Sequence, residues 1–232
     1  RREQNSLEPH VSFGEVIAIL PLCPLPPLHW WFLAQQHHQG PCSIDLNQRF
    51  MKQSLMNRMV LTGADGDFIV PFPIAKQSKK TDLLPEIMLS SHILPAQSWR
   101  SIQTAYGGAP FFEHLAPELE ALWHAHLPSN AGEEKPLSKW SWALLEWMAE
   151  TCDLNIPEPA VQPNPFSVNP WDLRDKRILN GDQWTFNRYP QVFEDRHSFR
   201  PALSSLDTLF VLGPHELKAR LPELVHPTST PA

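Results

Sequence analysis

The stretch MVLTGADGDFIVPFPI, Met59 to Ile74, decides how this chain is expected to fold. Two apolar runs rich in β-branched and aromatic residues flank the turn-forming segment GADGD, residues 63–67. Such a pattern predicts two antiparallel strands joined by a tight turn. We therefore expect a β-hairpin at this point of the chain.

Further apolar runs before and after the hairpin predict a small mixed sheet in the N-terminal part. The expected strands are Val16–Leu20, Ser43–Leu46, Met59–Leu61, Phe68–Phe72 and Ile87–Leu89. From Trp99 to Cys152 the apolar residues instead recur at helical spacing, as in Trp99, Ile102 and Tyr106. An order of strands followed by helices favours an α+β fold over a doubly wound sheet. Later, Gly213 is expected to end one helix and Pro214 to begin another.

Length and composition limit the architecture. The 232 residues, 42% of them hydrophobic and 19% charged, suit one globular domain with a sizeable core. We expect this α+β domain, with its largely helical C-terminal half, to cover residues 10–222. Residues 1–9 and 223–232 are expected to be flexible tails.

Charge and cysteine content bear on the partners and the compartment. A net charge of -6 argues against general nucleic-acid binding, which needs a basic face. Cys23, Cys42 and Cys152 form no CxxC pair and are expected to be buried thiols in a reducing compartment. The apolar run Val16–Leu28 is too short and too rich in proline to span a membrane. We therefore expect a cytoplasmic protein without a membrane span.

The histidines do not have the spacing of a metal site. His124 and His126 are two residues apart and point in different directions on a helix, and no HExxH motif is present. Glycine-rich phosphate loops and the GxSxG elbow of serine hydrolases are also missing from the sequence. The residues therefore imply neither a metal nor a cofactor.

A first polar group follows the second predicted strand. It consists of Asp45, Lys52, Gln53, Asn57 and Arg58. The two cations are suited to neutralise a carboxylate or a phosphate, and the two amides to bind a planar polar group. The alternative is that these side chains solvate a loop and that the cations pair with Asp45.

A second polar group lies near the C-terminus. Glu194 and His197 are three residues apart, and a histidine that titrates near neutral pH suits general acid–base catalysis. For Asp207 we favour a structural role, with Ser204 as the N-cap of a helix and Asp207 in its first turn.

The nine tryptophans and their aromatic neighbours are either core residues or a stacking surface for a sugar or a nucleotide. Their helical spacing favours the core. The aromatic residues expected to be buried are Trp99, Tyr106, Phe111, Phe112, Trp140 and Trp147.

Five segments in this order resemble the WbqC-like protein family. They are CPLPPLHWWF, IDLNQRFMKQSLMNR, LTGADGDFIVPFPI, SWRSIQTAYGGAPFFEHL and YPQVFEDRHSFRPALSSLDTLFVLGP. The pairing of Asn57-Arg58 with the downstream group Tyr106, Pro110 and Phe112 makes the match specific. The last segment looks most like the branch of the family that is common in the Bacteroidetes.

The resemblance implies a role in the synthesis of cell-surface polysaccharide, such as transfer of a glycyl or another acyl group to an O-antigen sugar. It also implies that Asp45, Lys52, Asn57 and Arg58 bind a substrate, and it adds Tyr106 to that set. Many relatives carry a polar residue directly after the first strand. Leu22 and Cys23 stand there in this chain.

Two functional hypotheses follow. In the first, Lys52, Asn57 and Arg58 bind an aminoacyl donor or a nucleotide-linked sugar, and Glu194 or His197 takes the proton of the attacking amine. In the second, the chain is a non-catalytic binding or assembly protein that contacts a protein partner through aromatic surface. The first hypothesis expects Asp45, Asn57, Arg58 and His197 to line one cleft.

Overall fold

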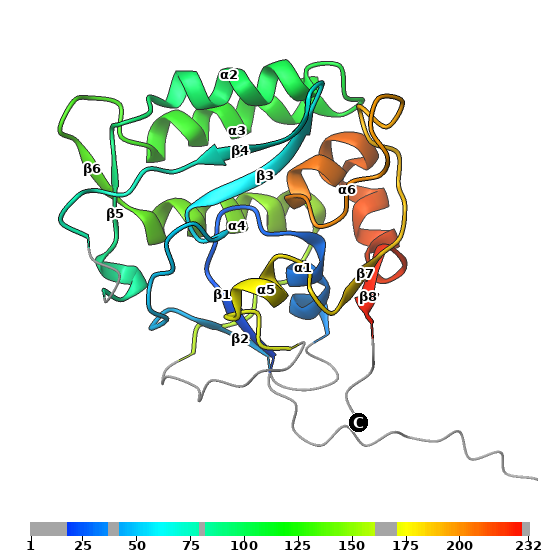
Figure 1. Cartoon of the computed structure of the whole chain (residues 1–232), viewed down its shortest axis with the longest axis horizontal. Coiled ribbons are helices and arrows are strands. Elements are labelled where there is room, and N and C mark those ends of the chain that lie inside the picture. The colour runs from blue at the N-terminus through cyan, green and yellow to red at the C-terminus, as the bar shows by residue number, and fades with distance from the viewer. Residues whose placement is uncertain (1–17, 37–41, 79–81, 161–170, 229–232) are drawn as a thin grey trace, which may run out of the picture.

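The predicted hairpin forms in the computed structural model, which describes residues 18–36, 42–78, 82–160 and 171–228. Strands β3 (Arg58–Gly63) and β4 (Gly66–Pro71) pair antiparallel, with Arg58 opposite Pro71 and Gly63 opposite Gly66. Gly66 has a φ of 111°, which an L side chain rarely adopts, so the turn depends on this glycine. Figure 1 shows the hairpin extending through the upper half of the molecule.

A second, parallel pair of strands precedes the hairpin. Strand β1 (Ala18–Pro21) lies beside β2 (Cys42–Asp45), and Pro21 at the end of one strand faces Asp45 at the end of the other. Helix α1 (Leu28–Gln35) lies in the crossover that a parallel pair requires. Ile19 also bridges Asp172 in parallel, and Ile44 bridges Pro159 in the same way. Four chain segments therefore run in the same direction, with their carboxyl ends at one edge.

The remaining strands form two short antiparallel pairs. Strand β5 (Met88–Ser90) follows the short 3-10 helix η1 (Leu84–Glu86) and pairs with β6 (Glu134–Pro136). Strand β7 (Trp184–Phe186) pairs with β8 (Val225–Pro227). All five predicted strands are present, but in the described residues the strands lie in four two-stranded sheets and not in one small mixed sheet. Adjacent apolar runs identify strands, but not the partner of each strand.

The α+β class is confirmed, and helices dominate the region where they were predicted. Between Trp99 and Cys152 they are α2 (Pro95–Tyr106), α3 (Phe112–His126) and α4 (Leu137–Cys152). The short α5 (Lys176–Leu179) and α6 (Ser205–Leu224) follow this region. Helix α6 is broken at Gly213, whose φ of 77° is not helical, as the sequence predicted. Within the range 223–232, which was expected from the sequence to be a tail, Leu224 and Val225 are buried and β8 pairs with β7.

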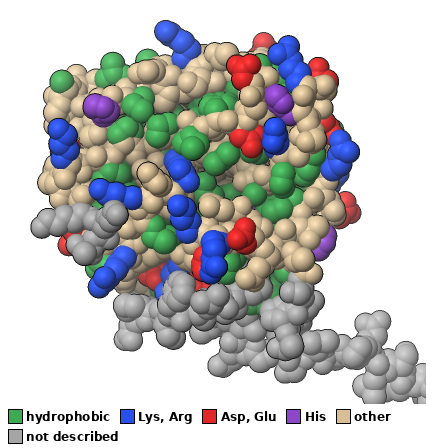
Figure 2. Space-filling model, viewed as in Figure 1, with side chains coloured by type: hydrophobic (Ala, Val, Ile, Leu, Met, Phe, Trp, Pro, Cys, Tyr) green, Lys and Arg blue, Asp and Glu red, His purple; other side chains and the backbone are tan. Residues whose placement is uncertain are grey.

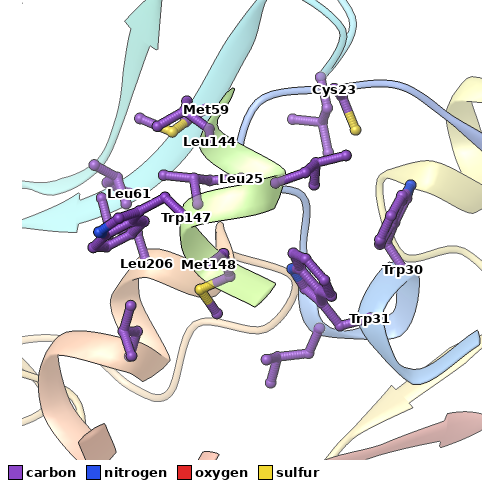
Figure 3. Packing of buried hydrophobic residues seen from close by; sticks show 14 of the residues in the cluster. Cys23, Leu25, Trp30, Trp31, Met59, Leu61, Leu144, Trp147, Met148 and Leu206 are labelled. Atoms are coloured by element: carbon purple, nitrogen blue, oxygen red, sulfur yellow. The ribbon is translucent and has the colours of Figure 1, made fainter. Parts of the chain in front are cut away.

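Aromatic side chains form much of the core. The Trp123 ring stands edge-on to Trp140 at 4.9 Å between centroids, and Phe72 on the hairpin side lies 5.6 Å from each of them. Side chains from α1, β3, α4 and α6 meet in the same core (Figure 3). Of the aromatic residues predicted to be buried, all are buried except Phe111, which is half-buried. The core interpretation of the aromatic residues is therefore confirmed.

Candidate functional site

The predicted site residue Asp45 lies in a buried ion cluster. Its Oδ2 accepts a hydrogen bond from Nη1 of Arg174 at 2.9 Å. The other side of the same guanidinium binds Asp172, with Nη2 to Oδ2 at 2.7 Å and Nε to Oδ1 at 2.9 Å. Asp45 therefore pairs with Arg174 and not with Lys52 or Arg58, so the alternative in which these cations pair with Asp45 is wrong.

Asn57 and Arg58 lie at the base of the hairpin. Asn57 Nδ2 donates to the Phe72 carbonyl at 3.2 Å, and the backbone of Asn57 accepts from the Phe72 N–H at 2.8 Å. Arg58 is the first residue of β3 and is half-buried. Lys52 and Gln53 are exposed in the preceding turn, where Gln53 has a φ of 57°. Asn57 thus fastens the end of the hairpin, and the two cations lie at or near the surface.

His197 and Glu194 lie near the other end of the hairpin. His197 Nε2 is 2.9 Å from the carbonyl oxygen of Ala64 in the hairpin turn. In the neutral imidazole the Nε2–H donates this bond, which leaves the lone pair on Nδ1. Glu194 forms an ion pair with Arg188. The two residues expected to act in proton transfer therefore share a loop but have different partners.

The predicted site residues do not line one cleft. Arg58 and Gly63 are at opposite ends of β3, which for a strand of this length means a separation of about 17 Å. Asn57 and Arg58 are thus at the base of the hairpin, and His197 is near its turn. Asp45 is buried in a third place, at the edge of the parallel strands.

Asp207 is the centre of a hydrogen-bonded network that the sequence did not reveal. Tyr106 Oη donates to its Oδ1 at 2.7 Å, and Tyr189 Oη donates to its Oδ2 at 2.7 Å. Gln191 Nε2 reaches the same Oδ2 at 3.2 Å. The Tyr106 hydroxyl also accepts from the backbone N–H of Thr62 at 3.2 Å. This network joins α2, the hairpin, α6 and the loop before α6.

Burial determines the electrostatics of this network. It raises the pKa of Asp207 above its usual range, although the hydrogen bonds from the two tyrosines act in the opposite direction. Burial and the neighbouring Asp207 raise the pKa of Tyr106 as well. Ser204 caps α6 as predicted, through its Oγ and the N–H of Leu206 at 3.4 Å, but the side chain of Asp207 takes no part in that cap. Tyr106, expected to touch substrate, is fully buried with its hydroxyl occupied.

A cleft opens beside this network, between the hairpin turn and α2. Its volume is about 530 Å³, and we call it the tip cleft. The side chains that give it its chemistry are Asp65, Asp67, Phe68, Gln97, Arg100, Ser101, Thr104 and Phe193. The four residues from α2 recur at helical spacing and form one polar face. Arg100 makes no ion pair among the described residues.

Chemically, the tip cleft combines a cation, two carboxylates, hydroxyl groups and two phenyl rings, and His197 contacts its wall. Ala64, whose carbonyl binds His197, is itself part of the wall of the cleft. Arg200 Nε lies 3.5 Å from Asp67 Oδ1 at the same end of the hairpin. Figure 2 shows hydrophobic side chains near the middle of the drawn face, bordered by Lys and Arg side chains and also by Asp and Glu side chains.

Arg100 was not among the site residues predicted from the sequence. The apolar spacing of α2 identifies only the buried face of this helix. The opposite face carries Gln97, Arg100, Ser101 and Thr104, and this polar repeat is the signal that could have identified the wall of the cleft.

Two further properties of the described residues concern membrane spans and metal sites. The helices in this part of the chain lack the combination of length and apolar character that a membrane crossing needs. The described ranges also hold no group of three or more histidine, cysteine or acidic side chains placed to bind one metal ion.

Comparison with known proteins identifies the family. The model of the WbqC-like protein family matches residues 44–162, just over half of the chain. No curated protein and no solved structure matches the chain. The matched region contains the hairpin, α2, α3 and α4, and therefore every lining residue of the tip cleft except Phe193, together with Tyr106 of the buried network. On this evidence, the chain belongs to the WbqC-like protein family.

Proposed function

We propose that the protein is a transferase of cell-surface polysaccharide synthesis, including that of O-antigen, and that the tip cleft is its active site. It moves a glycyl, another aminoacyl or an acyl group to the amine of a nucleotide-linked sugar. The observation that carries the proposal is the hydrogen bond from His197 to Ala64. It holds a histidine against Ala64, a residue in the wall of a cleft of substrate size, and a neutral ring bound in this way carries its lone pair on Nδ1.

The tip cleft has groups for each part of a nucleotide-linked sugar. Phe68 and Phe193 offer apolar ring faces to a base or a sugar ring. The Arg100 guanidinium is suited to pair with a diphosphate. Ser101 and Thr104 add hydroxyl groups from the next positions of the same helix face. In this proposal Arg100 takes the role that the sequence assigned to Lys52, Asn57 and Arg58, because it lines the cleft whose wall residue Ala64 contacts His197.

In the reaction, the neutral amine of the sugar attacks the carbonyl carbon of the donor. A carbon–nitrogen bond forms, and the bond from the carbonyl carbon to the leaving group breaks. His197 Nδ1 takes the amine proton and returns a proton to the leaving group. We prefer His197 over Glu194 as the proton acceptor because Glu194 is held by Arg188.

The proposed location of the protein is the cytoplasm.

Two variants test this proposal. His197→Gln keeps an N–H donor for Ala64 but has no basic nitrogen, so it should bind a uridine diphosphate-linked amino sugar and transfer the glycyl group of a glycyl thioester at least about 100-fold more slowly. Arg100→Ala should lose the binding itself. Calorimetry follows binding, and mass spectrometry follows the mass added to the sugar.

Arg177→Ala is the matched control, because Arg177 is exposed and pairs only locally with Asp175. It should change neither binding nor transfer. Transfer by His197→Gln at the rate of the unaltered protein would disprove the catalytic role. Full binding by Arg100→Ala would remove the tip cleft as the binding site.

The alternative, a binding or assembly protein with an aromatic docking surface, has less support. Seven of the nine tryptophans are buried, and the other two, Trp142 and Trp171, are half-buried. The tryptophans therefore stabilise the core and do not form the aromatic surface that a protein partner would need. A protein partner stays a prediction of the second hypothesis.

A further inference from the structure

A second groove lies at the carboxyl edge of the parallel strands. Leu22 directly follows β1 and Leu46 directly follows β2, and both line this groove of about 350 Å³. The other wall comes from the end of α3 and one face of α4, with His126, Lys139, Trp142 and Glu146. We call it the edge groove. It shares no lining residue with the tip cleft.

The position of the edge groove is one where parallel strands characteristically bind ligands. The chain segments beside Ile19 and Ile44 extend the parallel pair on both sides, so the groove lies beyond the carboxyl ends of adjacent parallel segments. In open parallel sheets the loops leaving these ends create a crevice that holds small molecules. The buried ion pair between Asp45 and Arg174 fixes the strand ends next to it.

The apolar part of the edge groove has a defined orientation. Trp142 is half-buried, and its Nε1–H donates to Glu146 Oε1 at 2.8 Å, one helical turn further along α4. This bond fixes the indole in one direction. With Leu22 and Leu46 opposite, the ring provides a flat apolar surface of the kind on which the C–H face of a sugar ring packs.

The polar part of the groove surrounds this surface. Lys139 is exposed and makes no ion pair among the described residues. Burial and the nearby Lys135 lower the pKa of His126, so its ring is neutral near pH 7 and has one donor and one acceptor. The Glu146 carboxylate accepts hydrogen bonds. Lys139, a cation without an ion pair, suits a single negative charge on the ligand, and the His126 ring and the Glu146 carboxylate suit its hydroxyl groups.

We infer that the edge groove binds a ring-form sugar with one anionic group, a uronate or a sugar phosphate. The ring packs on Trp142, the anionic group pairs with Lys139, and the hydroxyls bond to His126 and Glu146. This site is distinct from the tip cleft and adds a second sugar-binding position to the protein.

Calorimetric titration of the full chain tests the inference. The probes are glucuronate, glucose 6-phosphate, glucose and inorganic phosphate. The two anionic sugars, or one of them, should bind with a Kd in the millimolar range, more tightly than glucose or phosphate alone. Binding of only one anionic sugar would identify the source of the negative charge. Equal binding of glucose, equal binding of phosphate, or no binding of either anionic sugar would overturn the inference.

Variants then locate the binding. Lys139→Gln should weaken it about fivefold, as expected for an exposed ion pair. Trp142→Ala should weaken it at least about tenfold, and Trp142→Phe, which keeps a ring, should weaken it less. Lys218→Gln is the matched control, because Lys218 is an exposed lysine that pairs with Asp153. Unchanged binding by both Lys139→Gln and Trp142→Ala, or loss of binding by Lys218→Gln, would place the ligand elsewhere and overturn the inference.

Arg100→Ala separates this site from the tip cleft. That variant should bind the anionic sugars as the unaltered protein does, even though it loses the uridine diphosphate-linked amino sugar. Loss of anionic-sugar binding in Arg100→Ala would show that these probes occupy the tip cleft, and would overturn the edge groove as their site. Failure of the transferase proposal would leave the edge groove unaffected.

Discussion

Tyr106 and Asp207 are 101 residues apart in the chain, and their side chains share a hydrogen bond of 2.7 Å in the interior of the molecule. Tyr189 and Gln191 bind the same carboxylate, so the network has several donors for one acceptor group. The Thr62 N–H, which bonds to the Tyr106 hydroxyl, links it to the hairpin beside the tip cleft. The position of the cleft wall therefore depends on this buried carboxylate.

Replacing the carboxylate should destabilise the fold. Asp207→Asn turns one acceptor oxygen into a donor, so a buried tyrosine hydroxyl loses its acceptor, at a cost of about 1–3 kcal/mol. Tyr106→Phe removes the hydroxyl group that donates to this carboxylate. Because the two residues act in one network, the double variant should cost less than the sum of the single variants. Urea unfolding gives the free energy of unfolding of all three variants. A loss in the double variant equal to the sum of the two single losses would contradict the coupling.

Gly213→Ala should be strongly destabilising. A Cβ at this position would lie 2.5 Å from the ring of Phe111, and the φ of 77° is unfavourable for alanine. We expect a loss of at least about 2 kcal/mol and a clearly lower melting temperature. Gly108→Ala is the control, because a Cβ there meets no atom within 4 Å. Equal melting temperatures for the two variants would show that the break in α6 does not need glycine.

His29 predicts how stability depends on pH. It is fully buried, its Nε2 lies 3.1 Å from the Leu179 carbonyl oxygen, and burial lowers its pKa from 6.5 to about 3. Below pH 6.5, His29 binds a proton in the unfolded chain but not in the folded protein. The contribution of His29 to the free energy of unfolding is therefore complete above pH 6.5 and falls as the pH decreases towards 3. The loss between pH 7 and pH 5 should be about 2 kcal/mol.

His29→Gln keeps a donor for Leu179 but does not titrate. Its free energy of unfolding should therefore change less between pH 7 and pH 5 than that of the unaltered protein. Urea unfolding at the two pH values gives the comparison. An identical change in both proteins would mean that His29 is not the group that titrates on unfolding.

The ion cluster at the edge of the parallel strands predicts a structural role for Asp45. Asp45→Asn and Arg174→Gln should each lower the free energy of unfolding by about 3–5 kcal/mol, because each leaves a buried charge without a full partner. Arg58→Ala should cost far less, and its effect should add to that of Asp45→Asn, since Arg58 is not in the cluster. Non-additive costs for Arg58 and Asp45 would instead place them in one network.

The features that the sequence predicted correctly depend on residues near each other in the chain. The hairpin at Gly63–Gly66 and the break at Gly213 follow from local turn chemistry, and the burial of Trp99 and Trp140 follows from helical spacing. The spacing of the apolar residues shows which face of an element is apolar, and this face packs against the core.

The contacts that organise the candidate site join distant residues, and no local pattern identifies them. Asp45 looked like a partner for Arg58 because the two lie 13 positions apart, yet its partner is Arg174. Asp207 looked like a helix-capping residue because of Ser204, yet its carboxylate binds Tyr106. A carboxylate can pair with any cation or donor that the fold brings near, so residue type and sequence spacing leave the choice open.

The Asp45–Arg174 pair has a consequence for the order of folding during synthesis. Asp45 leaves the ribosome 129 residues before Arg174, which at about 5–20 residues per second is a delay of roughly 6–26 seconds. Until then, burying the end of β2 would bury a charge without its partner. The hairpin, in contrast, needs only neighbouring residues and forms early. The strands that emerge before the hairpin are therefore expected to reach their final packing after it.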